Sequence, residues 1–156
     1  MWGWSLIFGR LLLAWLDRNG REVPHDLVVA NPTLAASGSA TLGHTERVIA
    51  AAANEDVLSE WLFDVTDPPS IVKTRAPEKS ARNVASVKRA AAAELRQALT
   101  IPNRSRVEGR RILVYDDVCT TGSQLNAVAE CLIEDGHAVS VEGIVLARAP
   151  WRRREG

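Results

Sequence analysis

One stretch of the chain, residues 111–124, restricts the possible folds more than any other part of the sequence. Residues 111–115 have the apolar character and the length of a buried strand, and a polar segment follows them. Apolar residues then recur at helical spacing from 125 to 133, with Gly136 suited to end the helix. A second apolar run at 139–146 completes the predicted order of strand, helix and strand.

Continuous apolar strands joined by a helix predict a parallel sheet that helices cover on both faces. An earlier β-branched run at 27–31, which ends in Asn-Pro, adds a further strand. The length of 156 residues is that of one domain. We therefore expect a single α/β domain with its core at 26–147, after an N-terminal helical segment, 1–25, and before a basic tail, 148–156.

Four further elements are expected from apolar spacing and from helix stop signals. A first helix ends near Gly20, because glycine after an asparagine is a common helix terminus. The spacing of apolar residues also predicts helices over 45–63 and 81–99, and residues 71–75 have the character of a short strand.

Composition excludes several classes of partner. The 19 Lys and Arg residues balance 19 Asp and Glu residues, so direct nucleic-acid binding is not expected. The cysteines, Cys119 and Cys131, lack metal-ligand spacing, which indicates free thiols and a cytoplasmic protein. Arg10 interrupts the apolar N-terminal stretch, whose remaining runs are shorter than the ~20 residues that cross a bilayer. No membrane segment is therefore expected.

The polar segment 116–123 has the donors and acceptors of a sugar-phosphate site. Backbone N–H groups and hydroxyls at 120–123 precede a predicted helix, and the positive end of the helix dipole suits a phosphate. Asp116 and Asp117 would repel a phosphate, so sugar hydroxyls or a divalent cation are their natural partners. A capped helix after a buried strand would use the same residue types without a ligand. The functional interpretation is a ribose 5-phosphate site.

Residues 112–124, which read ILVYDDVCTTGSQ, resemble the phosphoribosyl pyrophosphate (PRPP) motif of type I phosphoribosyltransferases. The resemblance implies that Asp116 and Asp117 contact the ribose hydroxyls and, together with PRPP, help to hold Mg²⁺ as the cofactor. The other residues that it assigns to PRPP, mainly to its 5-phosphate, are Val118, Cys119, Thr120, Thr121, Gly122, Ser123 and Gln124. Gln124 replaces the last threonine of the motif.

The resemblance extends to other segments in the same order along the chain. Residues 26–32, 43–46, 73–75, 82–84 and 108–117 are similar to the ComF-like branch, which is associated with competence and DNA uptake. The N-terminal zinc ribbon of that branch is not expected here, because the sequence has no CxxC pair. Only residues 1–25 are available for the hood that selects the acceptor in this family.

The leaving pyrophosphate needs cations and N–H donors. The residues that the resemblance assigns to pyrophosphate are Asn31, Pro32, Thr33, Lys73 and Arg75, with Lys79 and Arg82 in a position to assist. The residues expected to act in catalysis are Lys73, Arg75 and Asp117. The histidines, His25, His44 and His137, are scattered and are predicted to be structural.

These observations predict a PRPP-binding phosphoribosyltransferase that transfers the 5-phosphoribosyl group to a base or amine and releases pyrophosphate. The acceptor is not determined, and a homodimer is expected. The alternative is a non-catalytic binding module that keeps the PRPP fold and acts through protein partners.

Overall fold

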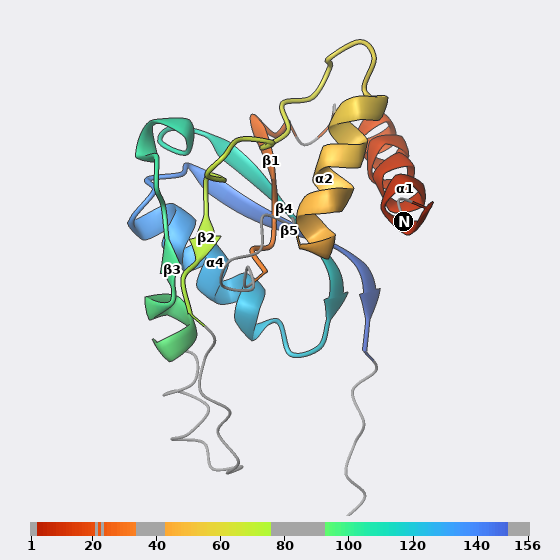
Figure 1. Cartoon of the computed structure of the whole chain (residues 1–156). Helices are drawn as coiled ribbons and strands as arrows, with labels where there is room; N and C mark the ends of the chain where they lie inside the picture. The colour runs from red at the N-terminus through yellow and green to blue at the C-terminus, as the bar shows by residue number, and fades with distance from the viewer. Residues whose placement is uncertain (1–2, 21, 23, 34–42, 76–92, 150–156) are drawn as a thin grey trace, which may run out of the picture.

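The computed structural model describes residues 3–20, 22, 24–33, 43–75 and 93–149. A parallel sheet in the order β1-β4-β5 forms its centre (Figure 1). Its strands are β1 (Leu27–Ala30), β4 (Arg111–Cys119) and β5 (Ser140–Arg148). Helices α1 (Gly3–Asn19) and α2 (His44–Glu55) pack on one face, and α4 (Ser123–Glu134) packs on the other. The predicted α/β fold with a helix-flanked parallel sheet is confirmed.

The core divides into two clusters because successive strand residues point to opposite faces of the sheet. Toward α4 the strands present Leu27, Val29, Ile112 and Val114. Toward α1 and α2 they present Val28, Leu113 and Tyr115. This use of both faces explains why the strands are continuously apolar in the sequence.

Helix α1 ends at Asn19, as predicted, and lies against α2. Gly9 allows the close approach, since a Cβ there would lie 2.9 Å from the backbone nitrogen of Ala52. Leu12 and Leu16 of α1 are buried in the core. Within the described part of the chain, no helix combines the length and apolar character needed to cross a membrane.

The prediction of a helix over 45–63 is wrong beyond residue 55, where α2 ends. The Asp56 carboxylate accepts hydrogen bonds from the backbone N–H groups of Glu60 and Trp61, which stabilises a turn. The chain then runs beside β1, where the backbone of Val28 bonds to the residues on either side of Phe63. Pairing with the free edge of β1 therefore overrides the helical spacing.

A second, antiparallel sheet consists of β2 (Val72–Lys73) and β3 (Leu99–Thr100). It confirms a short strand inside 71–75. The predicted helix over 81–99 is wrong at its end, because residues 93–97 are helical but Leu99 pairs with Lys73. The rest of that helix falls mostly at 76–92, outside the described residues, as do Lys79 and Arg82. A short 3₁₀ helix, η1 (Arg104–Arg106), leads toward β4.

An ion pair joins the start of β1 to the start of β4. The Arg111 guanidinium donates to both carboxylate oxygens of Asp26, at 3.0 and 2.8 Å, and its backbone N–H donates at 2.8 Å. These hydrogen bonds hold the pKa of the Asp26 carboxyl well below its ordinary value of 3.8.

This ion pair gives a prediction for acid stability. A lowered folded-state pKa contributes stability above the ordinary pKa, and the contribution is lost as pH falls toward the folded value. The free energy of unfolding should therefore decrease as the pH is lowered past about 4, the ordinary carboxyl pKa. In Asp26→Asn it should decrease less steeply. Urea unfolding at pH 7 and pH 3 measures this. Equal pH dependence in the two proteins would contradict the assignment.

Candidate active site

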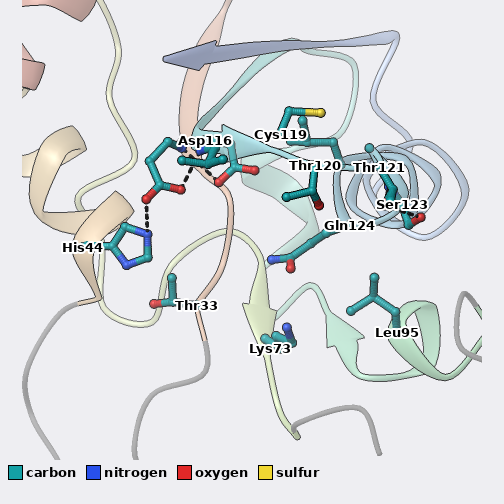
Figure 2. A pocket seen from close by; sticks show the side chains of 14 residues that line it. Thr33, His44, Lys73, Leu95, Asp116, Cys119, Thr120, Thr121, Ser123 and Gln124 are labelled. Carbon is teal, nitrogen blue, oxygen red and sulfur yellow. Dashed lines mark hydrogen bonds and ion pairs between the residues drawn. The ribbon is translucent and has the colours of Figure 1, made fainter. Parts of the chain in front are cut away.

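A pocket of about 480 Å³ opens at the carboxyl end of the parallel sheet (Figure 2). Ligands of open α/β sheets bind at this edge. The predicted residues that line the pocket are Thr33, Lys73 and the whole segment 116–124. The fold thus brings together three stretches that are far apart in the sequence.

The two carboxylates lie inside β4, which continues through Cys119 instead of ending before them. Asp116 is 8% exposed and accepts a hydrogen bond from the backbone N–H of Asp117 at 3.0 Å. Burial raises the pKa of the Asp116 carboxyl, although a hydrogen bond from Asn31 opposes the shift. Burial and the nearby Asp117 and Asp116 carboxylates raise the pKa of Tyr115 to about 12. This strand end therefore has a negative potential that suits hydroxyl donors or a cation.

The N-terminus of α4 forms another part of the pocket. Gly122 has φ +78°, a left-handed conformation that glycine adopts without strain. The Thr121 and Ser123 hydroxyls lie 2.9 Å apart, and the Ser123 N–H donates to the Thr121 hydroxyl oxygen at 3.4 Å. Unpaired N–H groups and the positive end of a helix can hold a phosphate.

Gln124 is directed to the loop after β1. Its side-chain N–H groups donate to Oδ1 of Asn31 at 3.1 Å and to the carbonyl of Pro32 at 3.3 Å. An amide nitrogen has two hydrogens, so both have acceptors within the protein. Gln124 thus connects α4 to Asn31, whose side chain in turn hydrogen-bonds Asp116. This arrangement makes Gln124 a positioning residue and leaves the backbone to donate to a phosphate.

The loop 31–33 is attached to the beginning of α2. Glu46 accepts hydrogen bonds from the backbone N–H and hydroxyl of Thr33, and the Thr45 hydroxyl donates to the Asn31 carbonyl at 2.8 Å. Gly43 leaves room for these contacts, because a Cβ there would fall 1.7 Å from the Thr33 hydroxyl oxygen. Of the three loop residues, only Thr33 lines the pocket, since Asn31 is buried and Pro32 lines a smaller cavity of about 80 Å³.

The structure separates the two predicted cations. Lys73 lies on β2 at the side of the pocket opposite the acidic pair (Figure 2). Burial lowers the pKa of its ammonium, and within the described residues it has no hydrogen bond or ion pair. Arg75 is exposed, donates to Oε1 of Gln97 at 3.2 Å and is not among the pocket-lining residues. Lys73 is therefore the cation available to a ligand.

His44 is the main pocket residue that the sequence interpretation missed. It lines the pocket as the first residue of α2, with Nε2 2.9 Å from Oδ2 of Asp117. Leu95 and Leu125 add apolar lining. The sequence signals for His44 were its place near a predicted helix start and within the segment 43–46, and neither reveals what the helix end faces. No residue of α1 lines this pocket, so the described part of the segment 1–25 does not cover it.

The oxygen-only donor set of Asp116 and Asp117 fits Mg²⁺ chemically. Among the described residues no group of three His, Cys, Asp or Glu side chains could hold a metal without help. Magnesium would therefore share these carboxylates with oxygens of a bound substrate, the usual arrangement for this ion with phosphates.

Comparison with known proteins supports the fold. The chain is similar to the crystal structure of purine phosphoribosyltransferase from Pyrococcus horikoshii Ot3, with a TM-score of 0.51 and 18% identity, over 95% of this chain and 75% of that one. It therefore has a phosphoribosyltransferase fold. Competence protein ComFC of Bacillus subtilis (strain 168) is 45% identical over 42 residues, which are 27% of this chain and 18% of that protein. No protein-family model matches the chain.

Proposed function

We propose that the protein binds PRPP and transfers its 5-phosphoribosyl group to a base or amine. The observation that carries the proposal is the meeting, in one pocket, of an acidic pair, a helix N-terminus and a lysine whose ammonium has no partner among the described residues. Asp116 and Asp117 would accept hydrogen bonds from the ribose hydroxyls. The N-terminus of α4 would hold the 5-phosphate, and Lys73 would face the pyrophosphate.

In the proposed reaction, the lone pair of the acceptor nitrogen forms a bond to C1 of the ribose, and the nitrogen loses its N–H proton to solvent. The bond between C1 and the pyrophosphate oxygen breaks, and the pyrophosphate leaves with the bonding electrons. Positive charge develops on the ribose in the transition state, where the Asp116 and Asp117 carboxylates would stabilise it. Bound Mg²⁺ would neutralise charge on the leaving pyrophosphate.

The proposal includes a cytoplasmic location. Both cysteines are free thiols, Cys119 partly exposed and Cys131 buried. Free thiols are typical of a reducing compartment.

Calorimetry with two related ligands tests the proposal. Wild-type protein should bind PRPP saturably, and more tightly with Mg²⁺ than without it. Lys73→Ala should weaken PRPP binding by about 10- to 100-fold, the value of one hydrogen bond to a charged group. The same variant should bind ribose 5-phosphate as the wild type does, because that ligand has no pyrophosphate. An equal loss for both ligands would contradict the role of Lys73, and no saturable PRPP binding would refute the proposed function.

A second candidate, a non-catalytic module that acts through protein partners, is favoured by the similarity to a protein named for competence. A pyrophosphate-release assay separates the two functions. Purines, pyrimidines and amines would be offered as acceptors together with PRPP and Mg²⁺. Saturable PRPP binding without pyrophosphate release for any acceptor would favour the module, and release with one acceptor class would support the transferase.

A further inference from the structure

His44 lines the pocket and contacts Asp117. The proposed binding of PRPP gives this contact no role. Its Nε2 lies 2.9 Å from Oδ2 of Asp117, and the contact is drawn as a dashed line in Figure 2. The imidazole is 59% exposed and the carboxylate 38% exposed. Both groups are therefore open to a ligand as well as to each other.

The contact adds an ion pair to the Asp117 carboxylate. Oδ1 accepts a hydrogen bond from the backbone N–H of Val118 at 2.7 Å, and Oδ2 is the oxygen that faces His44. The hydrogen bond on one oxygen and the ion pair on the other restrict rotation of the carboxylate group. The buried Asp116 needs no such donor from α2, because Asn31 and the backbone of Asp117 already hold it.

His44 itself stands on an anchored helix end. The next two residues, Thr45 and Glu46, bind the backbone or side chain of the loop 31–33 through four hydrogen bonds of 2.8–3.0 Å. The helix end therefore has a defined position relative to the strand that precedes this loop, β1. Because β1 pairs with β4 along four residues, that position is transmitted to Asp117.

We infer that His44 is a positioning residue that holds the Asp117 carboxylate in the orientation in which it accepts a ribose hydroxyl. The inference rests on the proposed function, since ribose is the ligand that Asp117 would meet. Thr33 and Lys73 also line the pocket, but neither makes a hydrogen bond or an ion pair with Asp117.

Calorimetry with PRPP and Mg²⁺ on three variants gives the first test. His44→Ala should weaken binding by about two- to fivefold, the value of one partly exposed ion pair. His44→Gln, which can place an amide N–H near Nε2, should recover most of the loss. His137→Asn is the matched control, because His137 is exposed, lies outside the pocket and has φ +58°, which asparagine tolerates.

A second readout needs no ligand. The side-chain carboxyl ¹³C resonance of Asp117 should shift in His44→Ala and stay unchanged in His137→Asn. An unchanged resonance in His44→Ala overturns the inference, whether or not PRPP binds to the wild type. Weaker PRPP binding with an unchanged resonance would mean that His44 touches the ligand directly, which also overturns it. Absence of PRPP binding by the wild type refutes the proposed function alone.

Discussion

Replacing Asp116 with asparagine is expected to weaken PRPP binding by about 100-fold while it makes the ligand-free protein more stable. The loss follows because ribose hydroxyls would no longer meet a charged acceptor, and hydrogen bonds to charged groups contribute about 1.5–3 kcal/mol each. The gain follows because burial of this carboxylate is unfavourable, as its raised pKa indicates. Asparagine keeps an oxygen that can accept from Asn31 and from the backbone of Asp117.

The size and the pH dependence of the gain can both be measured. Each ~1 kcal/mol gained raises Tm by about 2–4 °C in a domain of this size. A raised folded-state pKa destabilises the protein above the ordinary carboxyl pKa of 3.8, so the gain should be present at pH 7. The gain in stability should vanish in strong acid, where the Asp116 carboxyl of the wild type is protonated in both the folded and the unfolded state.

Glu130→Gln is the control for the Asp116 variant, because Glu130 lies on the exposed side of α4 and the change is again acid to amide. It should alter neither Tm nor PRPP affinity. Calorimetry and thermal unfolding of both variants complete the experiment. Wild-type affinity in Asp116→Asn would remove this carboxylate from the ribose site, and a lower Tm would mean that its burial is fully compensated.

Replacing Leu132 with alanine is expected to lower the free energy of unfolding by about 3 kcal/mol, within the range of buried leucine truncations. Leu132 belongs to α4, is 0% exposed and packs against the sheet face that carries Val114. The cavity left by the substitution would lie beneath α4, whose N-terminus lines the pocket. Urea unfolding followed by tryptophan fluorescence measures the change, since the chain has five tryptophans.

Leu58→Ala is the matched control for Leu132, with the same chemical change at a residue that is 79% exposed. Its effect should stay within about 0.5 kcal/mol, as for most surface substitutions. Leu58 falls within the helix that the sequence predicts over 45–63, whereas α2 ends at Glu55. A loss of more than about 1 kcal/mol in Leu58→Ala would contradict its exposed position.

The sequence alone was sufficient to predict the α/β class and the parallel strands, whereas β4 continues through Cys119 and includes the first four residues of the segment 116–124. These features depend on local patterns: a continuous apolar run, a glycine able to adopt positive φ, and polar residues at a helix start. Each pattern lies within about a dozen residues, so the chain itself carries it. The same locality explains the error over 56–63, where helical spacing continues although the backbone pairs with β1.

Only the tertiary structure decided which side chains share the pocket. Gln124 meets Asn31 across 93 residues of sequence, and His44 meets Asp117 because α2 is anchored to the loop after β1. Lys73 faces the acidic pair because β2 pairs with β3, while Arg75 turns toward Gln97. Such contacts depend on how separate elements pack, and no pattern within one segment specifies the partner. The sequence therefore determined the strand and the helix that flank residues 120–122, and the packing of α2 and β2 determined which side chains surround that segment.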